Sequence, residues 1–384
     1  MISCGEPSGD LYAGALASEI LGIAPATTIT GFGGDRLAAA GATLVENFSG
    51  LSVTGLVEVV RLLPRTYATY KRMLADADAV RPDVFVAIDF PDFNFTLARA
   101  LKRRGIPVVY YISPQLWAWR AGRMKTMQRF VDLVLVIFPF EEPIYRQAGV
   151  PVEWVGHPLL DLQPAAQPRD MFLSAHGLDP ARPVLALLPG SRTNELREIL
   201  PRLAEAAVRI RQRVPDVQFI AARAPHLRDE LFEPLRQIGA AGTPVITVDG
   251  RADDVLASAD AAVVASGTVT VQGALQQCPM VVVYRLSPLT YRVGKPFVRV
   301  DTYAMANLVA GRRVVAELIQ DDFTPDAVAD EAVRLLTDRA YADRMRAGLR
   351  DVREKLGGPG ASRRAAEAIL QVAQGARTQR TQRT

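Results

Sequence analysis

Short, uninterrupted apolar runs alternate with segments of helical periodicity along the chain. In the first half the runs are residues 27–32, 83–89, 107–113 and 132–138, separated by helix-like segments such as 94–105. Strands that are apolar at consecutive positions are typical of parallel sheets covered by helices on both faces. The pattern therefore predicts a doubly wound α/β domain.

The same alternation restarts after Pro183, and it predicts a second doubly wound domain whose apolar runs are residues 184–189, 217–222, 244–249, 260–266 and 279–284. A proline-rich stretch without periodicity, 156–170, separates the halves as a linker does. We expect an N-terminal domain over 1–157, a C-terminal domain over 158–349, and a C-terminal helix over 350–384. That helix is expected to pack on the N-terminal domain or on a partner subunit, and its final repeat, 378–384, to be disordered.

Two such domains that face each other bring the carboxyl ends of both sets of strands to one central cleft, where open α/β sheets bind ligands. We therefore expect the active site in that cleft. The first apolar run, residues 2–4, is shorter than an ordinary core strand. This shortness suggests that residues are missing upstream of Met1.

Composition narrows the class of partner. The 384 residues carry 45 basic and 41 acidic side chains, a balance that argues against nucleic acid as a partner. Cys4 and Cys278 are too few for a disulfide framework and fit a reduced cytoplasmic setting. No apolar run approaches the ~20 residues that span a bilayer. With three histidines, no metal-ligand cluster is visible, and His157 in the linker is interpreted as structural.

Residues 184–192, VLALLPGSR, end an apolar run in a turn that leads through Ser191 and Arg192 into a helix-like segment. This order of strand, turn and helix presents free N–H groups and a positive dipole end to an anion, and Arg192 adds a forked cation. The pattern indicates a phosphorylated ligand. The alternative is an ordinary turn whose arginine pairs with a carboxylate.

A second anion-ready strand end follows in the same domain. The run 260–266 leads into Gly267 and Thr268, and Gln272 lies one helical turn further on the same face. Ser266, Gly267 and Thr268 can surround a phosphate, and Gln272 can reach a ribose. The alternative is that Ser-Gly-Thr is an ordinary helix N-cap.

Two polar segments of the first domain also follow apolar runs. GEPSGD allows close backbone approach at Gly5 and Gly9, and its polar residues are candidates either to contact a sugar or to cap a helix: Glu6, Ser8 and Asp10. Asp89 ends the run 83–89, where partial burial suits a general base. Asp92 is its rival, either of them could instead cap the helix that follows, and Asn94 is expected to contact substrate.

Aromatic and basic residues occur together in two places. YYISPQLWAW, residues 110–119, includes Trp117 and Trp119, and the cations Arg120, Arg123, Lys125 and Arg129 follow. This mixture suits an amphiphilic phosphorylated ligand, or it is a core patch beside a solvated basic face.

Residues 51–63 are apolar on almost every helical face. They include Val57, Val60 and Leu63, and Arg61, Arg65, Lys71 and Arg72 are close by. Such a helix can lie in the interface of an anionic membrane. The alternative is a buried helix between domains.

Eight segments in order carry a family resemblance: GEPSGD, IDFPDFN, YYISPQLWAW, FPFE with Tyr145, VGHPL, LLPGSR, ASGT and PMVVVYR. Together, from Gly5 to about Gln320, they resemble the lipid-A-disaccharide synthases. The resemblance implies two Rossmann-like domains of the GT-B fold. It implies that 1–157 is the acceptor-side and membrane-associating domain and that 158–349 is the UDP-sugar-binding domain, with no metal and no cofactor. It implies an inverting hexosyltransferase that joins UDP-2,3-diacylglucosamine to 2,3-diacylglucosamine 1-phosphate, a phosphorylated glycolipid acceptor, through a β-1,6 link. It also implies peripheral association with the inner face of the inner membrane and leaves open a homodimer.

Residue by residue, the resemblance implies that Asp89 is the base, that Arg192 is an essential cation, and that Ser266, Gly267, Thr268 and Asn307 surround the UDP. Two positions depart from the family pattern. Gln272 replaces a usual glutamate, and Met305-Ala306-Asn307 replaces Leu-Pro-Asn. Because glutamine still hydrogen-bonds a ribose, we expect weaker nucleotide binding without loss of activity.

Two rival hypotheses are a UDP-sugar 2-epimerase of the same architecture and a nucleotide-sugar-binding regulator that consumes nothing. The apolar segment 51–63 and the cluster of Trp117, Trp119 and the arginines favour the lipid enzyme over the epimerase. The regulator would bind UDP-sugar without consuming it.

Overall fold

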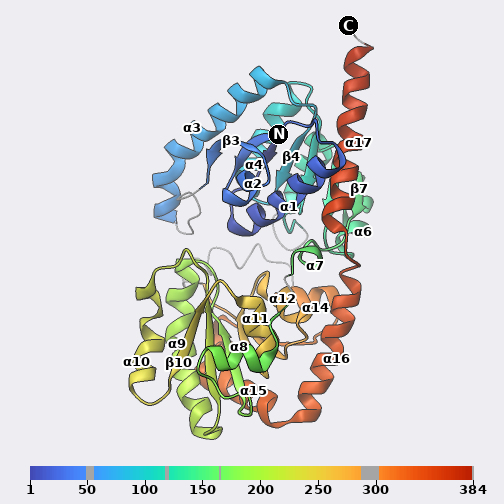
Figure 1. The fold of residues 1–384 in the computed structure, drawn as a ribbon. Helices are drawn as coiled ribbons and strands as arrows, with labels where there is room; N and C mark the ends of the chain where they lie inside the picture. Colours follow the sequence, from blue (N-terminus) through green and yellow to red (C-terminus); the bar gives the residue numbers. More distant parts are fainter. Residues whose placement is uncertain (49–55, 117–120, 164–165, 287–301, 383–384) are drawn as a thin grey trace. The chain divides into compact units, whose positions relative to one another are not determined.

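The computed structural model describes residues 1–48, 56–116, 121–163, 166–286 and 302–382. The chain divides into two compact units (Figure 1). Unit 1 takes its described residues from Met1–Leu162 and Leu356–Thr384, and unit 2 from Gln163–Pro296 and Val300–Lys355. The first unit is therefore closed by the last segment of the chain, and each unit is described by itself.

Unit 1 contains a seven-stranded parallel sheet with the strand order β3-β2-β1-β4-β5-β6-β7. Its strands are β1 (Ile2–Ser3), β2 (Thr30–Gly33), β3 (Thr43–Asn47), β4 (Phe85–Ile88), β5 (Val108–Tyr111), β6 (Leu133–Val136) and β7 (Val152–Trp154). The strands β1, β2, β4, β5 and β6 are buried at nearly every position, which explains their continuous apolar sequence.

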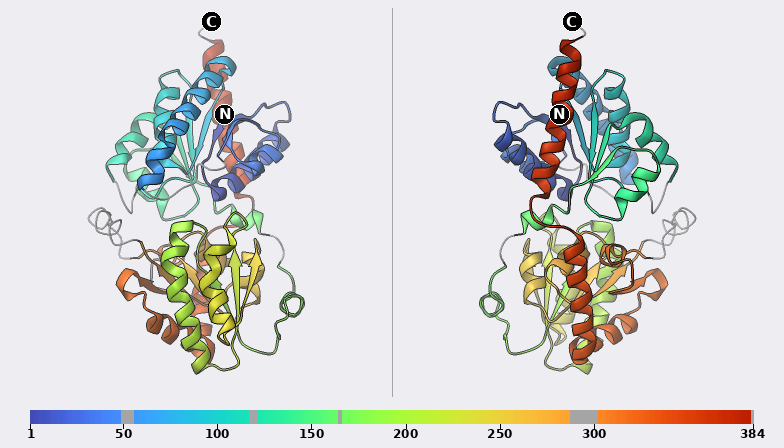
Figure 2. Two further views of the ribbon diagram at one scale, coloured as in Figure 1. Left: turned by 90° about the vertical axis from the view of Figure 1, so that its left-hand side faces the viewer. Right: turned by 90° about the vertical axis from the view of Figure 1, so that its right-hand side faces the viewer.

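Two groups of helices cover the sheet of unit 1 (Figure 2). One group is α1 (Pro7–Ile23), α2 (Asp35–Ala39) and α17 (Ala361–Thr381); the other is α3 (Leu56–Val80), α4 (Pro91–Lys102), α5 (Met124–Phe130) and α6 (Glu141–Gln147), with η1 (Ala121–Arg123) and α7 (Leu159–Leu162) in the connections. The helix α17, red in both figures, packs along α1. Because α17 continues to Thr381, the prediction of disorder from residue 378 is wrong for residues 378–381.

Unit 2 contains a six-stranded parallel sheet with the order β10-β9-β8-β11-β12-β13. Its strands are β8 (Val184–Leu188), β9 (Gln218–Arg223), β10 (Val245–Asp249), β11 (Ala261–Ala265), β12 (Met280–Tyr284) and β13 (Ala316–Ile319). The order changes direction between β8 and β11, which is the switch point where such sheets bind ligands.

The helices of unit 2 also form two layers. One layer is α9 (Thr193–Arg213), α10 (Glu233–Ala240) and α15 (Pro325–Thr337); the other is α8 (Arg169–Ala175), α11 (Ala252–Ser258), α12 (Val269–Leu275), α14 (Met305–Ala310) and α16 (Arg339–Lys355), with η2 (Asp229–Phe232) and η4 (Gln320–Asp322) in the loops. Both units are thus doubly wound, as the sequence predicts.

Candidate active site

Asp89 lies directly after β4, in a backbone conformation that few residues adopt. Asp89 and Phe90 have φ values of 46° and 44°, in the left-handed region that is costly for side chains with a Cβ. Two hydrogen bonds hold this strand end: the Tyr110 hydroxyl donates to the Asp89 carbonyl at 2.7 Å, and Asn94 Nδ2 donates to the same carbonyl at 2.8 Å. The half-buried Asp89 side chain therefore sits on a strained but fixed backbone.

Asn94 ties the carboxyl ends of β1 and β4 together. It has no exposed surface. Its Oδ1 accepts from Ser3 Oγ at 2.6 Å, and its Nδ2 also approaches the carbonyls of Ile88 at 3.2 Å and Ser3 at 3.3 Å. Asn94 therefore holds the backbone at these two strand ends, and its contact with substrate stays a prediction.

The GEPSGD turn begins α1 at Pro7 and packs against Phe90. A Cβ on Gly5 would lie 2.5 Å from the Phe90 ring, so only glycine allows this approach. Glu6 and Ser8 are half-buried near the start of the helix and keep their predicted role as candidates for sugar contact.

Asp10, in contrast, caps a different helix. Its carboxylate accepts three backbone N–H groups at the start of α2, from Gly34 at 2.8 Å, Arg36 at 2.9 Å and Leu37 at 3.1 Å. The side chain is buried. The predictions that Asp10 contacts a sugar or caps its own helix are both wrong, because the N–H groups it satisfies belong to α2.

Asp92 differs from Asp89 in its surroundings. Its side chain is 78% exposed and pairs with Arg123. The N-cap position of α4 is Phe90, so neither aspartate stands at the position from which a side chain ordinarily caps this helix. The half-buried position at the strand end favours Asp89 over Asp92 as the base.

His157 is a buried, uncharged residue of unit 1. Burial lowers the pKa of its imidazole from 6.5 to about 3. Its Nδ1 accepts from the Leu159 N–H at 3.2 Å, and its ring lies 5.3 Å from that of Phe138. These contacts give His157 a structural role.

Several predicted residues cannot be placed. Trp117, Trp119 and Arg120 lie outside the described residues, as do residues 51–55 of the apolar segment. The backbone of Val57 and Val60 belongs to α3, but their side chains are outside the described part of the structure. Tyr110 and Tyr111 are buried in β5, which fits the core interpretation for this part of the aromatic cluster.

In unit 2, the PGSR turn joins β8 to α9. Gly190 has a φ of 114°, and Arg192 is the N-cap residue of α9. The Glu195 carboxylate accepts from Arg192 Nη1 at 3.2 Å and from the Ser191 N–H at 3.3 Å. A carboxylate therefore occupies the position where we expected a phosphate, as the alternative of an ordinary turn also predicts.

The Arg192–Glu195 pair is weak enough to exchange partners. Arg192 is 42% exposed, and exposed ion pairs contribute about 0–1 kcal/mol. A diphosphate offers the same guanidinium two charged oxygens and a bidentate geometry. Breaking this one pair therefore costs little free energy.

Two residues near this turn were not predicted. His226 Nε2 lies 2.8 Å from the Ser191 carbonyl. Tyr284 ends β12, and its pKa is raised by burial and by the charge of Glu195, which Arg192 opposes. Both come from other strands, so spacing in the sequence could not reveal them.

The Ser-Gly-Thr segment follows β11, next to β8. Gly267 and Thr268 are exposed, and Ser266 Oγ donates to the Tyr303 carbonyl at 3.1 Å. Thr268 is the N-cap residue of α12, but within the described residues its side chain makes no cap hydrogen bond, so the alternative of an ordinary N-cap is not supported. Gln272 donates its amide to Asp253 of α11.

Asn307 has its hydrogen-bonding groups engaged inside the protein. The side chain is buried, donates to the Val315 carbonyl at 2.9 Å and to Glu317 Oε1 at 2.7 Å, and accepts from the N–H groups of Val314 and Val315. Glu317 in turn accepts the N–H groups of Tyr303 and Ala304, each at 3.0 Å. Asn307 and Glu317 thus hold the backbone at Tyr303, which Ser266 contacts, and the predicted place of Asn307 near the UDP stays a prediction.

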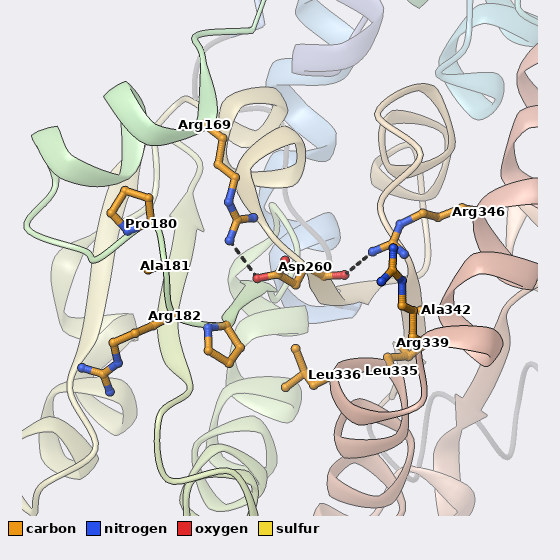
Figure 3. A pocket seen from close by; sticks show the side chains of 11 residues that line it. Arg169, Pro180, Ala181, Arg182, Asp260, Leu335, Leu336, Arg339, Ala342 and Arg346 are labelled. Atoms are coloured by element: carbon orange, nitrogen blue, oxygen red, sulfur yellow. Dashed lines mark hydrogen bonds and ion pairs between the residues drawn. The ribbon is translucent and has the colours of Figure 1, made fainter.

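A cavity of about 540 Å³ lies at the other end of the unit 2 strands, where β8 and β11 begin (Figure 3). Asp260 is at its centre and accepts from Arg169 Nη2 at 2.9 Å and from the Val184 N–H at 2.8 Å. Arg346 donates to the Asp260 carbonyl at 3.3 Å, and Arg182 donates to the Asp216 carbonyl at 3.0 Å. These cations have partners within the protein. We therefore interpret the residues around the cavity as an ion-pair network that joins the starts of β8 and β11.

In the described residues, no helix is long and apolar enough to span a membrane. No group of three or more His, Cys, Asp or Glu residues in that same part could hold a metal ion.

The architecture defines a class. The chain aligns with the crystal structure of a glycosyltransferase of kitacinnamycin over 97% of this chain and 98% of that one (TM-score 0.64, 20% identity). It aligns with the calicheamicin glycosyltransferase over 96% and 98% (TM-score 0.59, 18% identity) and with UDP-GlcNAc 2-epimerase from Neisseria meningitidis over 96% and 98% (TM-score 0.66, 14% identity). The fold is the GT-B fold of two-domain glycosyltransferases.

Sequence comparison defines the family. The sequence model described as Lipid-A-disaccharide synthetase matches residues 1–372. The lipid-A-disaccharide synthase of Geobacter sulfurreducens is 46% identical over 375 residues, covering 97% of this chain and 96% of the relative, and that of Myxococcus xanthus is 43% identical over 373 residues, covering 97% of each. The chain belongs to the lipid-A-disaccharide synthase family, and it is a hexosyltransferase of lipid A biosynthesis.

Proposed function

We propose that the chain transfers 2,3-diacylglucosamine from its UDP derivative to 2,3-diacylglucosamine 1-phosphate. The products are the β-1,6-linked disaccharide 1-phosphate and UDP. Family membership supports the role in lipid A synthesis. The observation that carries the mechanism is the half-buried Asp89 side chain at the end of β4, on a backbone whose carbonyl accepts hydrogen bonds from Tyr110 and Asn94.

The proposed reaction is a single displacement. The oxygen of the acceptor 6-hydroxyl attacks the anomeric carbon of the donor while Asp89 takes the hydroxyl proton. The bond from that carbon to the diphosphate oxygen breaks, and its electron pair leaves with UDP. Attack from the face opposite to the leaving group inverts the configuration and gives the β link.

Unit 2 supplies the proposed donor site. Arg192 moves from Glu195 to the diphosphate, and the N–H groups at the start of α9 and the exposed Thr268 bind its remaining oxygens. Gln272 binds the ribose. Positive charge and N–H groups held in place before the reaction stabilise the charge that grows on the leaving UDP.

Asp89→Asn tests the base. The substitution keeps the shape of the side chain and removes the proton acceptor, so we expect kcat to fall by about 10²–10⁴-fold with UDP binding retained. Asp92→Asn is the matched control. Wild-type turnover in Asp89→Asn with intact UDP binding would contradict the proposal, and a large loss in Asp92→Asn alone would transfer the role to Asp92. Product analysis separates a disaccharide from the epimerised monosaccharide of the rival reaction.

We also propose that α3 binds the inner face of the inner membrane. Leu63 and Tyr67 are 56% and 61% exposed, and they are neighbours on the surface of α3 because they are four residues apart. Arg65, Lys71 and Arg72 are exposed on the same helix. Apolar side chains next to cations suit the interface of an anionic membrane, where the acylated substrates of the proposed reaction reside.

A further inference from the structure

The amide of Gln272 faces a carboxylate from the neighbouring helix. Its Nε2 lies 3.2 Å from both Oδ1 and Oδ2 of Asp253. Gln272 is on α12 and Asp253 is on α11, and these two helices pack together. Both side chains are half-buried.

This contact determines which way the amide points. The two ends of a glutamine amide are a donor and an acceptor, and a free amide can rotate to present either. Turning the Gln272 carbonyl toward Asp253 would place two acceptors against each other. The carboxylate therefore keeps the NH₂ group on its own side and directs Oε1 away from α11.

The position of Gln272 makes this orientation relevant to a ligand. Its backbone N–H bonds to the Thr268 carbonyl at 3.1 Å, so the side chain lies one helical turn from the exposed strand end at Gly267 and Thr268. A ribose hydroxyl can donate to Oε1. An NH₂ group in the same place could not accept a hydrogen bond from the hydroxyl.

We propose that Asp253 is a positioning residue that makes Gln272 a hydrogen-bond acceptor for the ribose of the nucleotide. The inference rests on the proposed function, because it takes UDP as the ligand. Asp253 acts through Gln272.

The partners of Asp253 and of its neighbour Asp254 support this role. In the part of the chain that the structure describes, Asp253 forms no ion pair. Its neighbour Asp254 is engaged elsewhere: it accepts from Arg251 Nε and from the Gln167 N–H, each at 2.9 Å. Asp254 therefore ties the start of unit 2 to α11, whereas the Asp253 carboxylate is directed to Gln272.

The pair also constrains what residue 272 can be. A glutamate at this position would place a second carboxylate within hydrogen-bond distance of Asp253, and the two charges would repel. Asparagine at 253 would remove the repulsion, because its NH₂ group can donate to the glutamate. The carboxylate at position 272 on α12 would then accept a hydrogen bond from the amide at position 253 on α11, the reverse of the wild-type pair.

The experiment measures UDP, 2′-deoxy-UDP and 3′-deoxy-UDP binding by calorimetry in the full-length protein and four variants: Asp253→Ala, Asp253→Asn, Gln272→Glu and Gln272→Glu with Asp253→Asn. The wild type is expected to bind UDP about three- to tenfold more tightly than at least one deoxy analogue, which is the usual strength of one hydrogen bond. Asp253→Ala should lose most of this preference for UDP. Asp253→Asn should lose part of it, because two facing amides can rotate together and no longer fix Gln272 as the acceptor. Contrary to the expectation from the family pattern, Gln272→Glu should bind UDP more weakly than wild type, because Asp253 repels the added charge. The double variant should recover to within about twofold.

Turnover gives a second readout. Because the ribose contact is present in the ground state and the transition state alike, Asp253→Ala should raise KM for the UDP-sugar and leave kcat nearly unchanged. Asp326→Asn, which removes an exposed carboxylate of α15 in the other layer of unit 2, is the control for loss of charge. Thermal unfolding of Asp253→Asn, which has the same shape as wild type, separates a folding defect from a binding defect.

The outcomes separate the two claims. If wild type binds UDP but the ratio of UDP to deoxy analogues is unchanged in Asp253→Ala, or if the double variant is no better than Gln272→Glu, the positioning role of Asp253 is overturned and the proposed function stands. If wild type binds no UDP, the proposed function fails and this inference fails with it.

Discussion

The backbone position of Asp89 depends on Gly5, a neighbour that has no side chain. Gly5→Ala would place a Cβ 2.5 Å from the Phe90 ring, and Phe90 is the second of the two left-handed residues at the end of β4. We expect the ring and the Asp89 backbone to shift, with kcat/KM at least about tenfold lower and the free energy of unfolding lower by about 1–3 kcal/mol. Steady-state kinetics and urea unfolding measure the two effects.

Gly22→Ala on α1 is the control for this substitution. In the described structure a Cβ at Gly22 has no atom within 4 Å, and alanine favours the helix by up to about 1 kcal/mol. Activity and stability should therefore be at least those of wild type. Unchanged kinetics in Gly5→Ala would show that the Phe90 contact does not position Asp89.

The buried His157 predicts a pH dependence for the stability of unit 1. Its folded-state pKa of about 3 lies below the unfolded value of 6.5, so only the unfolded chain binds the proton at intermediate pH. The stability contribution is complete above about pH 6.5 and decreases toward pH 3, by about 1.4 kcal/mol per pH unit. His157→Asn, which keeps an acceptor for the Leu159 N–H, should show a shallower slope.

Urea unfolding at pH 7.5, 6.5 and 5.5 measures this slope. All three tryptophans lie within residues 1–162, so their fluorescence reports on unit 1 alone. Equal slopes for wild type and His157→Asn would mean that the histidine is protonated in the folded unit.

At the scale of elements, Glu317 on the edge strand β13 organises the loop before α14. It accepts two consecutive backbone N–H groups and the amide of Asn307. Glu317→Gln removes the charge and turns an NH₂ group toward these donors, so we expect KM for the UDP-sugar to rise about three- to tenfold with a smaller change in kcat. Glu205→Gln, at an exposed pair on α9, should leave both constants unchanged. A wild-type KM in Glu317→Gln would show that this loop does not contribute to the donor site.

The edge strands also show where sequence pattern stops predicting the fold. The predicted apolar runs are the interior strands and β10, whereas β3, β7 and β13 were not predicted. All three lie at sheet edges, and each is short and contains a glutamate: Glu46, Glu153 and Glu317. Edge strands have one unpaired side and partial solvent exposure, so they need not be apolar. Continuous hydrophobicity therefore identifies the strands at the centre of a sheet.

The residues of the candidate site also divide into those that the sequence pattern predicts and those that it does not. Asp89, Arg192 and Thr268 were predictable because each follows an apolar run, and strand ends are where α/β sheets bind ligands. Their partners were not, except for Glu195 three residues after Arg192. Asp10 of α1 reaches the N–H groups at the start of α2, Asp253 reaches Gln272, and Glu317 reaches the Tyr303 N–H. These contacts form only when separate segments pack, so no spacing in the chain encodes them.

At the scale of the whole molecule, the prediction concerns membrane association. Replacing Leu63 and Tyr67 by serine removes two exposed apolar side chains from α3, and at 1.5–3 kcal/mol for full burial of each we expect binding to anionic vesicles to fall at least about tenfold. Val57 and Val60 to serine should act in the same direction. Sedimentation with phosphatidylglycerol vesicles measures the effect.

Val80→Ser is the matched control, because Val80 is also an exposed apolar residue but lies at the other end of α3. Neutral vesicles test the contribution of the cations. Undiminished sedimentation of the Leu63 and Tyr67 variant, or no binding by wild type, would mean that α3 is not the membrane contact.

The helix α17 packs against α1 even though the whole of unit 2 lies between them in the chain. Domains generally fold in order as they leave the ribosome, but here the earliest-made domain lacks one of its covering helices until translation has passed residue 361. A nascent chain must therefore carry an unfinished first domain with the apolar face of α1 uncovered while the second is synthesised. A premature stop codon near the 3′ end of the reading frame would consequently damage the domain encoded at the 5′ end.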